Sequence, residues 1–294
     1  MSDLHPRLNA FRADLADIGL KGRVEAPRFT APRAQQVVVA VADMRRVPRP
    51  DSAIDTQLLF GELVDVFDDA EGWCWVQARN DKYVGYVSDA ALSARISAPT
   101  HVICAPRTFV YPGPDMKFPA ETALSIGSQI AVTGEAETRG TRYLLLSSGG
   151  AVVESHVAPA RELFTDPAAL AERLLETPYL WGGKSGYGID CSGLVQLTHA
   201  LCGIHLQRDT AMQSETAGKI IHPGRDGVEL RRGDLVFWRG HVAMMLDPKT
   251  IIHASGHSMS VAREGFAEAV ERIGYMYGAP TGYRRIDPST AYPD

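Results

Sequence analysis

Short β-rich runs separated by turn residues fill the first half of the chain, and this texture limits its fold more than any other feature. From Gln35 they follow one another at residues 37–41, 58–60, 63–67, 73–76 and 83–87. Evenly spaced short strands of this kind predict a small all-β barrel. The pattern begins again after Pro99, at residues 102–103, 108–111, 130–132 and 143–146, which predicts a second, similar barrel.

A different texture begins near Pro167. Residues 168–175 and 192–201 place leucines at helical spacing, and Gly203 stands just past the second of these runs. Strand-like runs follow at residues 234–238, 242–246 and 250–253. One helical hairpin followed by antiparallel strands predicts an α+β domain.

A chain of 294 residues is too long for one ordinary core, so we expect several domains. Leu8, Phe11, Leu15 and Ile18 have helix-like spacing before the chain is broken by Pro27. The sequence therefore predicts four parts: an N-terminal helical extension at 1–33, a first barrel at 34–97, a second barrel at 98–160 and the α+β domain at 161–294.

Composition excludes some function classes. The formal net charge of −5 and a pI near 6.0 give no electrostatic footprint for nucleic acid and no polybasic membrane patch. No run approaches the roughly 20 apolar residues of a membrane helix. The N-terminus lacks the basic and apolar regions of a signal peptide, and the four cysteines form no Cys-x-x-Cys pair. We therefore expect no nucleic-acid or membrane partner and a cytoplasmic location.

Cys191 is the most informative cysteine. Asp190 stands where a helix N-cap belongs, and Cys191 opens the apolar helix. The positive end of the helix dipole favours the thiolate, and the backbone N–H groups there can receive an oxyanion. These features predict an acidic, nucleophilic thiol, whereas a lone cysteine is more often a buried structural residue.

Two histidines bracket a predicted hairpin. His241 starts one strand and His253 ends the next, so an antiparallel turn brings them together. His241 can then take the thiol proton while His253 orients its imidazole. A zinc site built from the same three residues is an alternative, although no fourth ligand is evident.

The segments around these residues resemble the signature of the NlpC/P60 family of cell-wall cysteine peptidases. The motifs occur in the family's order at residues 178–184, 188–194, 208–213, 232–237, 241–243 and 252–256. The resemblance implies a papain-like fold with Cys191, His241 and His253 as catalytic residues and with no metal or organic cofactor. Residues 57–62 and 81–87 resemble bacterial SH3-like domains, except that Lys82 stands where Gly is commoner; the second barrel is recognised mainly by position.

The whole layout resembles γ-D-glutamyl-L-diamino-acid endopeptidases, also called dipeptidyl-peptidase VI. This resemblance implies a murein stem peptide with a free N-terminal L-Ala as substrate, cleaved before meso-diaminopimelate or Lys during cell-wall recycling. It also implies that the free amine is recognised by five residues, namely Asp190, Ser192, Tyr179, Tyr83 and Glu62. In that case the first barrel is part of the active site.

Two other functions stay open. The same scaffold can serve an amidase or acyltransferase, and the chain can be a wall-binding adaptor with an idle triad. The sequence does not specify the oligomeric state, the third residue of the stem peptide, whether free or wall-bound peptide is cut, or the role of the second barrel.

Overall fold

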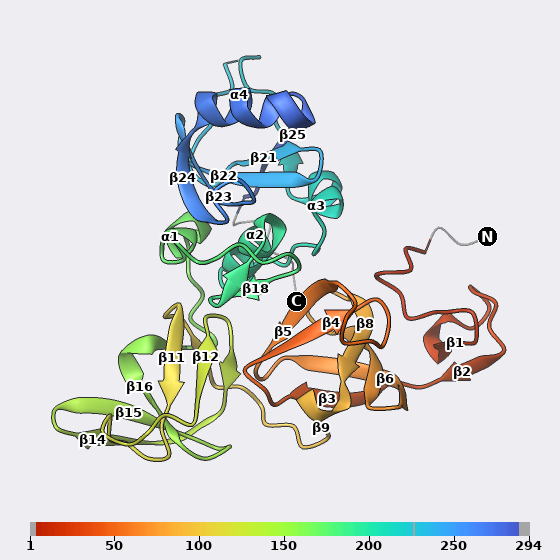
Figure 1. Cartoon of the computed structure of the whole chain (residues 1–294), viewed down its shortest axis with the longest axis vertical. Coiled ribbons are helices and arrows are strands. Elements are labelled where there is room, and N and C mark those ends of the chain that lie inside the picture. The colour runs from red at the N-terminus through yellow and green to blue at the C-terminus, as the bar shows by residue number, and fades with distance from the viewer. Residues whose placement is uncertain (1–3, 226, 288–294) are drawn as a thin grey trace. The chain divides into compact units, whose positions relative to one another are not determined.

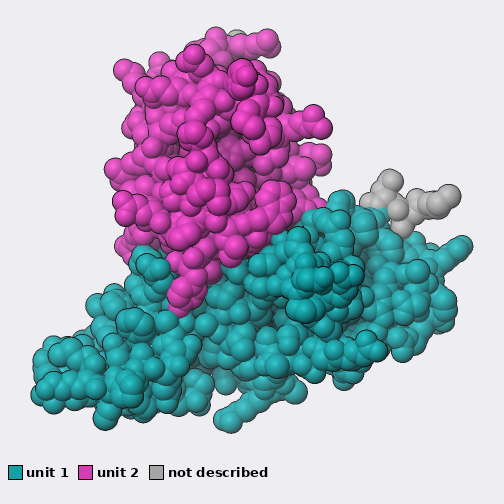
Figure 2. Space-filling model, in the orientation of Figure 1, with its two compact units in different colours: residues 1–162 teal, residues 163–294 magenta. Residues whose placement is uncertain are grey.

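A computed structural model describes residues 4–225 and 227–287 of the chain. It divides into two compact units, Met1–Glu162 and Leu163–Asp294, which are coloured separately in Figure 2. The first unit is built from strands β1 to β17 with three short 3-10 helices (Figure 1). The second holds all of the described α-helices, α1 to α4, together with β18 to β25.

The N-terminal segment is not the predicted helix. It contains strand β1 (Leu15–Asp17), a 3-10 turn η1 (Ile18–Leu20) and strand β2 (Arg28–Thr30), and β1 pairs with β2 in parallel. Some of its apolar side chains are buried against the first barrel, whereas Ile18 is 52% exposed. Ala10 and Leu15 pack with Phe67 and Trp75, so contacts with the barrel override the helical spacing.

The first barrel is one seven-stranded sheet in the order β5-β4-β8-β7-β6-β3-β9. Alternate residues of these strands, such as Val64 and Val66 of β6, fill its core. Its elements are β3 (Arg33–Val37), β4 (Val41–Arg45), β5 (Ile54–Leu59), β6 (Leu63–Ala70), β7 (Trp73–Ala78), β8 (Val84–Ser88), η2 (Asp89–Ala91) and β9 (Leu92–Ser93).

The second barrel has three small sheets in place of one continuous sheet, in the orders β13-β10-β17, β11-β12 and β14-β15-β16. They share a core that includes Ile103, Leu124 and Leu144. Its elements are β10 (His101–Ile103), β11 (Arg107–Val110), β12 (Thr122–Ser125), β13 (Gln129–Ile130), β14 (Val132–Thr138), β15 (Thr141–Leu146), β16 (Ala151–Val153), η3 (Glu154–His156) and β17 (Val157–Pro159).

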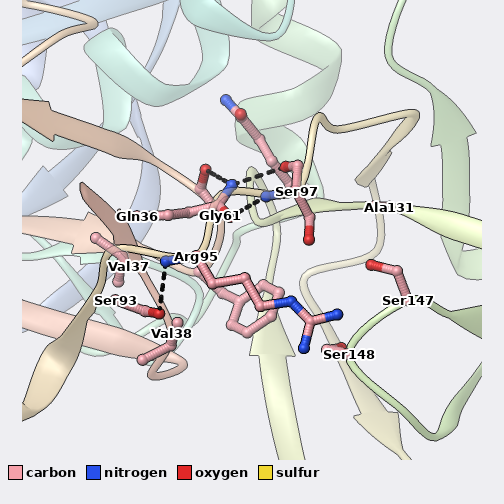
Figure 3. Close-up of a pocket in the computed structure, with 12 residues that line it drawn as sticks. Gln36, Val37, Val38, Gly61, Ser93, Arg95, Ser97, Ala131, Ser147 and Ser148 are labelled. Atoms are coloured by element: carbon pink, nitrogen blue, oxygen red, sulfur yellow. Dashed lines mark hydrogen bonds between the residues drawn. The ribbon is translucent and has the colours of Figure 1, made fainter. Parts of the chain in front are cut away.

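A pocket lies where the two barrels of this unit meet, and buried Gln36 holds one of its walls (Figure 3). The side-chain amide of Gln36 donates to the carbonyls of Gly61 and Ser97, and its oxygen accepts from the N–H of Ser97. Gly61 has φ +85°, and a Cβ there would lie 2.1 Å from the carbonyl oxygen of Gln129. The backbone of the first barrel therefore approaches that of the second at a point where only glycine fits.

The second unit is a six-stranded sheet in the order β20-β25-β21-β22-β23-β24, with α4 on one side and α1 and α2 on the other (Figure 1). This confirms the α+β prediction, although α3, α4 and β24 were not predicted. Its elements are α1 (Pro167–Glu172), β18 (Lys184–Ser185), β19 (Gly188–Ile189), α2 (Cys191–Ala200), α3 (Thr210–Thr216), β20 (Lys219–Ile220), β21 (Leu235–Trp238), β22 (His241–Asp247), β23 (Thr250–Ser255), β24 (Ser260–Gly265), α4 (Phe266–Tyr277) and β25 (Gly282–Arg285).

Helix α4 packs against one face of this sheet. Its apolar residues Ala269 and Ile273 pack on a cluster that includes Trp238, Met245 and Ile251 from three adjacent strands. The helix therefore covers the strands that carry the predicted catalytic histidines. Within the described residues, no helix is long and apolar enough to cross a membrane.

Candidate active site

Cys191 is the first residue of α2, as predicted. The carboxylate of Asp190 caps the helix by accepting from the N–H of Gly193 at 2.7 Å. The thiol is buried, lies 3.7 Å from the hydroxyl of Thr210 and receives a hydrogen bond from the backbone N–H of Val242. That contact places the sulfur at the start of β22, beside His241 in the chain.

The thiol is not acidic in this state. Burial, followed by the charge of Asp190, raises the pKa of Cys191 to about 11, although hydrogen bonds from Val242 and Thr210 oppose the rise. The expectation that the helix start alone holds a thiolate is therefore wrong, because the cost of burying the charge outweighs the helix dipole. The resting nucleophile is a thiol, so attack requires a base to remove its proton.

The two histidines meet as the hairpin prediction requires. Met244 of β22 pairs with Ile252 of β23, so antiparallel counting puts His253 level with Ala243, two residues from His241. The Nε2 atom of His241 lies 2.9 Å from the Nδ1 atom of His253. Burial lowers the pKa of His241 to about 3, which keeps its imidazole neutral and able to accept a proton.

The polar chain continues beyond the predicted triad. The Nε2 atom of His253 lies 3.2 Å from a carboxylate oxygen of Glu264 on β24. Arg272 on α4 donates to both oxygens of Glu264, at 2.8 and 2.5 Å. Glu264 and Arg272 were not predicted from the sequence, because neither β24 nor α4 was expected. A predicted strand after His253, with a carboxylate on the same face of the sheet as the histidine, would have indicated Glu264.

Arg208 begins the motif at residues 208–213, but its role was not predicted from the sequence. Its side chain is 2% exposed and donates to both oxygens of Asp190, at 3.0 and 2.7 Å, and to the hydroxyl of Ser192 at 2.8 Å. Ser192 in turn donates to Asp190 at 3.2 Å, and the N–H of Gly182 donates to it at 2.9 Å. Asp190 and Ser192 therefore form one buried network at the helix start.

Tyr179 belongs to the same neighbourhood. Its backbone forms a bridge with Ile189, and its N–H donates to the carbonyl of Met259 at 2.8 Å. Burial raises the pKa of Tyr179, and the charges of Cys191 and Asp190 raise it further. The hydroxyl is thus a neutral hydrogen-bonding group near the nucleophile.

Glu62 and Tyr83, the remaining predicted site residues, belong to the first unit. Tyr83 is fully buried, and its hydroxyl accepts a hydrogen bond from Arg7. Glu62 is 6% exposed and lies in the turn between β5 and β6. Lys82 has φ +64°, a left-handed conformation that explains why glycine suits this position better.

The zinc alternative finds no matching arrangement. Within the described residues, no group of three or more His, Cys, Asp or Glu side chains is placed to hold a metal ion. His253 turns Nδ1 to His241 and Nε2 to Glu264, so both of its ring nitrogens are engaged.

Two family models match the chain. The model described as the NlpC/P60 family matches residues 176–272, which include the whole polar chain from Cys191 to Arg272. Residues 176–272 form an NlpC/P60 domain. The model described as bacterial dipeptidyl-peptidase Sh3 domain matches residues 44–92, within the first barrel. The chain is therefore a cysteine peptidase with an SH3-like region before its NlpC/P60 domain.

Two relatives match most of the chain. The chain is 27% identical to dipeptidyl-peptidase 6 of Lysinibacillus sphaericus over 82% of this chain and 98% of the relative. It is 27% identical to a gamma-D-glutamyl-L-lysine dipeptidyl-peptidase of Bacillus cereus over 71% of this chain and 69% of the relative. A solved NlpC/P60 family protein from Bacillus cereus has a TM-score of 0.69 at 22% identity, covering 86% of this chain and 99% of that one. This last likeness, with the two family models, shows the fold, a papain-like NlpC/P60 domain preceded by an SH3-like β-rich region.

Proposed function

We propose that the protein is a cysteine endopeptidase that hydrolyses the bond between γ-D-glutamate and the diamino acid of murein stem peptides with a free N-terminal L-Ala. The observation that carries the proposal is the His241–His253 pair, 2.9 Å between ring nitrogens, at the strand start that contacts the Cys191 thiol. The name of one relative, gamma-D-glutamyl-L-lysine dipeptidyl-peptidase, supports the proposed bond, and dipeptidyl-peptidase in both names supports release of a dipeptide.

The chemistry follows from the resting protonation states. His241 takes the proton from Cys191 as the sulfur attacks the γ-glutamyl carbonyl, and backbone N–H groups at the start of α2 receive the oxyanion. The C–N bond then breaks, and His241 returns the proton to the leaving amine. Water hydrolyses the thioester with His241 again as the base, which releases the γ-glutamyl carboxylate and restores the thiol.

Recognition of the substrate amine is the second part of the proposal. An ammonium group requires acceptors, and a substrate that lacks it leaves them unpaired at a cost of about 1–3 kcal/mol each. Tyr179 and Ser192 supply hydroxyl acceptors near the thiol, and we include Glu62 and Tyr83 of the first barrel. Asp190 already accepts from Gly182, Gly193, Ser192 and Arg208, so we assign it to positioning Ser192 and the helix start.

The test is mass spectrometry of L-Ala-γ-D-Glu-diaminopimelate after incubation with the protein. We expect the dipeptide L-Ala-γ-D-Glu and free diaminopimelate, with no products from Cys191→Ala. Acetylation of the N-terminal alanine should remove most of kcat/KM. Equal cleavage of both peptides would contradict amine recognition, and no cleavage of either would contradict the proposed bond.

Substitutions in the first barrel test its contribution. Tyr83→Phe and Glu62→Gln should each lower kcat/KM for the free peptide by about 10- to 150-fold, equivalent to about 1.5–3 kcal/mol for a hydrogen bond to a charged group. The acetylated peptide should respond less, because it lacks the ammonium. Unchanged turnover in both variants would remove the barrel residues from the site.

The cellular role is also a proposal. Cys74, Cys191 and Cys202 form no disulfide bond, which suits a reducing compartment and recycling of free murein peptides in the cytoplasm. An amidase or acyltransferase would release different products from intact wall, and a wall-binding adaptor would bind the wall without turnover. Product analysis on free tripeptide and on intact wall separates these outcomes.

A further inference from the structure

We propose that Glu264 is a positioning residue that fixes the tautomers of both active-site histidines and so aims the basic nitrogen of His241 at Cys191. This inference rests on the proposed function only in taking His241 as the base for Cys191. It adds a carboxylate to the Cys-His-His set and assigns each proton in the chain.

The fold places Glu264 beside His253 for a simple reason. His253 pairs with Ala262 across the β23–β24 ladder, and Glu264 stands two residues further along β24. Residues two apart on a strand share a face, so Glu264 is the diagonal neighbour of His253 on the face that α4 covers. The observed distance from His253 Nε2 to the carboxylate is 3.2 Å.

Arg272 keeps Glu264 in a single state. Its Nε atom donates to one carboxylate oxygen at 2.8 Å, and a terminal nitrogen donates to the other at 2.5 Å. Such a two-point contact holds the carboxylate ionised and in one orientation. The same hydrogen bonds lower the pKa of Glu264. Glu264 is therefore an acceptor only.

The proton positions follow step by step. An ionised carboxylate has no hydrogen to give, so Nε2 of His253 must carry the proton in their contact. A neutral imidazole has one N–H, which leaves Nδ1 of His253 as an acceptor. His241 must then donate from Nε2 across the 2.9 Å contact, and its own free lone pair is on Nδ1. Nδ1 of His241 is the atom that accepts the thiol proton.

The opposite order would stop the reaction. If His253 carried its proton on Nδ1, it would donate to Nε2 of His241, and Nδ1 of His241 would carry a hydrogen. That histidine would present a donor to the thiol and could not accept its proton. Removing Glu264 lets the inactive order compete, which is a kinetic effect that needs no change in substrate binding.

Steady-state kinetics on the murein tripeptide test the kinetic effect. Glu264→Ala should lower kcat by about 10- to 100-fold with KM nearly unchanged, which is the usual loss when the carboxylate partner of a functional histidine is removed. Glu264→Gln keeps an acceptor oxygen and should recover most of that loss. Glu172 is the matched control: like that of Glu264, its carboxylate accepts from arginine, here from Arg232 and Arg263, but it lies outside the His241–His253–Glu264 chain, so Glu172→Ala should keep wild-type kcat.

Nitrogen-15 NMR of labelled histidines tests the proton order without substrate. In the wild-type protein both His253 and His241 should carry hydrogen on Nε2, and Glu264→Ala should move part of the His253 population to Nδ1. A wild-type His241 protonated on Nδ1, or wild-type kcat in Glu264→Ala, would overturn the inference. A wild-type protein that fails to cut the tripeptide would defeat the proposed function, while the NMR result would still decide the role of Glu264.

Discussion

Buried polar side chains occur in both units, but they are connected differently. In the second unit His241 contacts the buried His253, and His253 contacts the partly exposed Glu264, so these three side chains form one line. In the first unit Gln36 binds backbone groups, and the Tyr83 hydroxyl accepts from Arg7. Under the proton order that we propose, the first arrangement specifies where protons reside, whereas the contacts in the first unit are separate local hydrogen bonds.

Ion pairs show the same contrast. The Arg208–Asp190 pair of the second unit has side chains that are 2% and 11% exposed. The Arg79–Asp65 pair of the first barrel is 40% and 18% exposed. A surface pair is screened by water and contributes little, whereas a buried charge depends on its partner. The Arg208–Asp190 pair therefore cannot lose one partner without a large cost.

The largest effects should come from the directional histidine pair. His241→Ala removes the base and should lower kcat by about 10²- to 10⁴-fold. His253→Ala should cost less, because His253 only orients the base, and His253→Asn should cost least since its oxygen can still accept from His241. Steady-state kinetics on the tripeptide provide the measurement. Equal losses of kcat in all three variants would contradict the prediction, because His241 and His253 would then not have the distinct roles of base and orienting residue.

The next effect concerns the buried ion pair. Arg208→Ala leaves the carboxylate of Asp190 buried without its cation and should destabilise the second unit by about 3–5 kcal/mol. Arg79→Ala in the first barrel should cost about 1 kcal/mol or less. Hydrogen exchange, read separately on peptides from each unit, gives both values. A loss of protection in Arg208→Ala no larger than in Arg79→Ala would show that burial does not distinguish the units.

The sequence predicted the parts of the site that depend on local structure. Cys191 follows from an N-cap and an apolar helix, and His241 and His253 follow from a hairpin. Both are short-range patterns that the chain carries in its spacing. The structure agrees with them because capping and strand pairing are determined within a few residues.

The features that could not be predicted from the sequence depend on long-range packing. The raised pKa of Cys191 comes first from burial, which no local pattern reports. Glu264 reaches His253 only because β24 pairs with β23, and Arg272 reaches Glu264 only because α4 folds back on that face. The wrong prediction of an N-terminal helix also results from long-range packing, because the contacts of Leu15 with the barrel outweigh its helical spacing.

Acid should act on the second unit through its buried histidines. Burial lowers the pKa of His199 to about 4 and of His241 to about 3, and it lowers that of His253 as well. Between the usual value of about 6.5 and these values the unfolded chain binds more protons than the folded one. The stability of this unit is therefore full above about pH 6.5 and falls as the pH drops toward 4.

His199→Gln tests this acid response away from the active-site histidines. His199 is 1% exposed, and its Nδ1 donates to the carbonyl of Val195 at 2.7 Å, a bond that glutamine can replace. Loss of this one titrating group should flatten the stability curve by about 1.4 kcal/mol per pH unit within that window. Urea midpoints at pH 7 and pH 4.5, followed by exchange in each unit, give the slope. An unchanged slope would assign the acid response to other groups.

The smallest effect should arise in the first barrel, where the backbone conformation of Lys82 is unfavourable for its residue type. Lys82 adopts φ +64° with an exposed side chain, between Asp81 and the buried Tyr83. A left-handed conformation costs a residue with a Cβ about 1–2 kcal/mol, part of which glycine forfeits through the greater freedom of its unfolded chain. Lys82→Gly should therefore stabilise the barrel by about 0.5–1 kcal/mol.

Gly72 is the matched control, because it has φ +81° and a Cβ there would meet nothing within 4 Å. Gly72→Ala should destabilise by a similar amount for the same conformational reason. If the urea midpoints of the two variants move in the same direction, backbone conformation does not govern the stability of these turns.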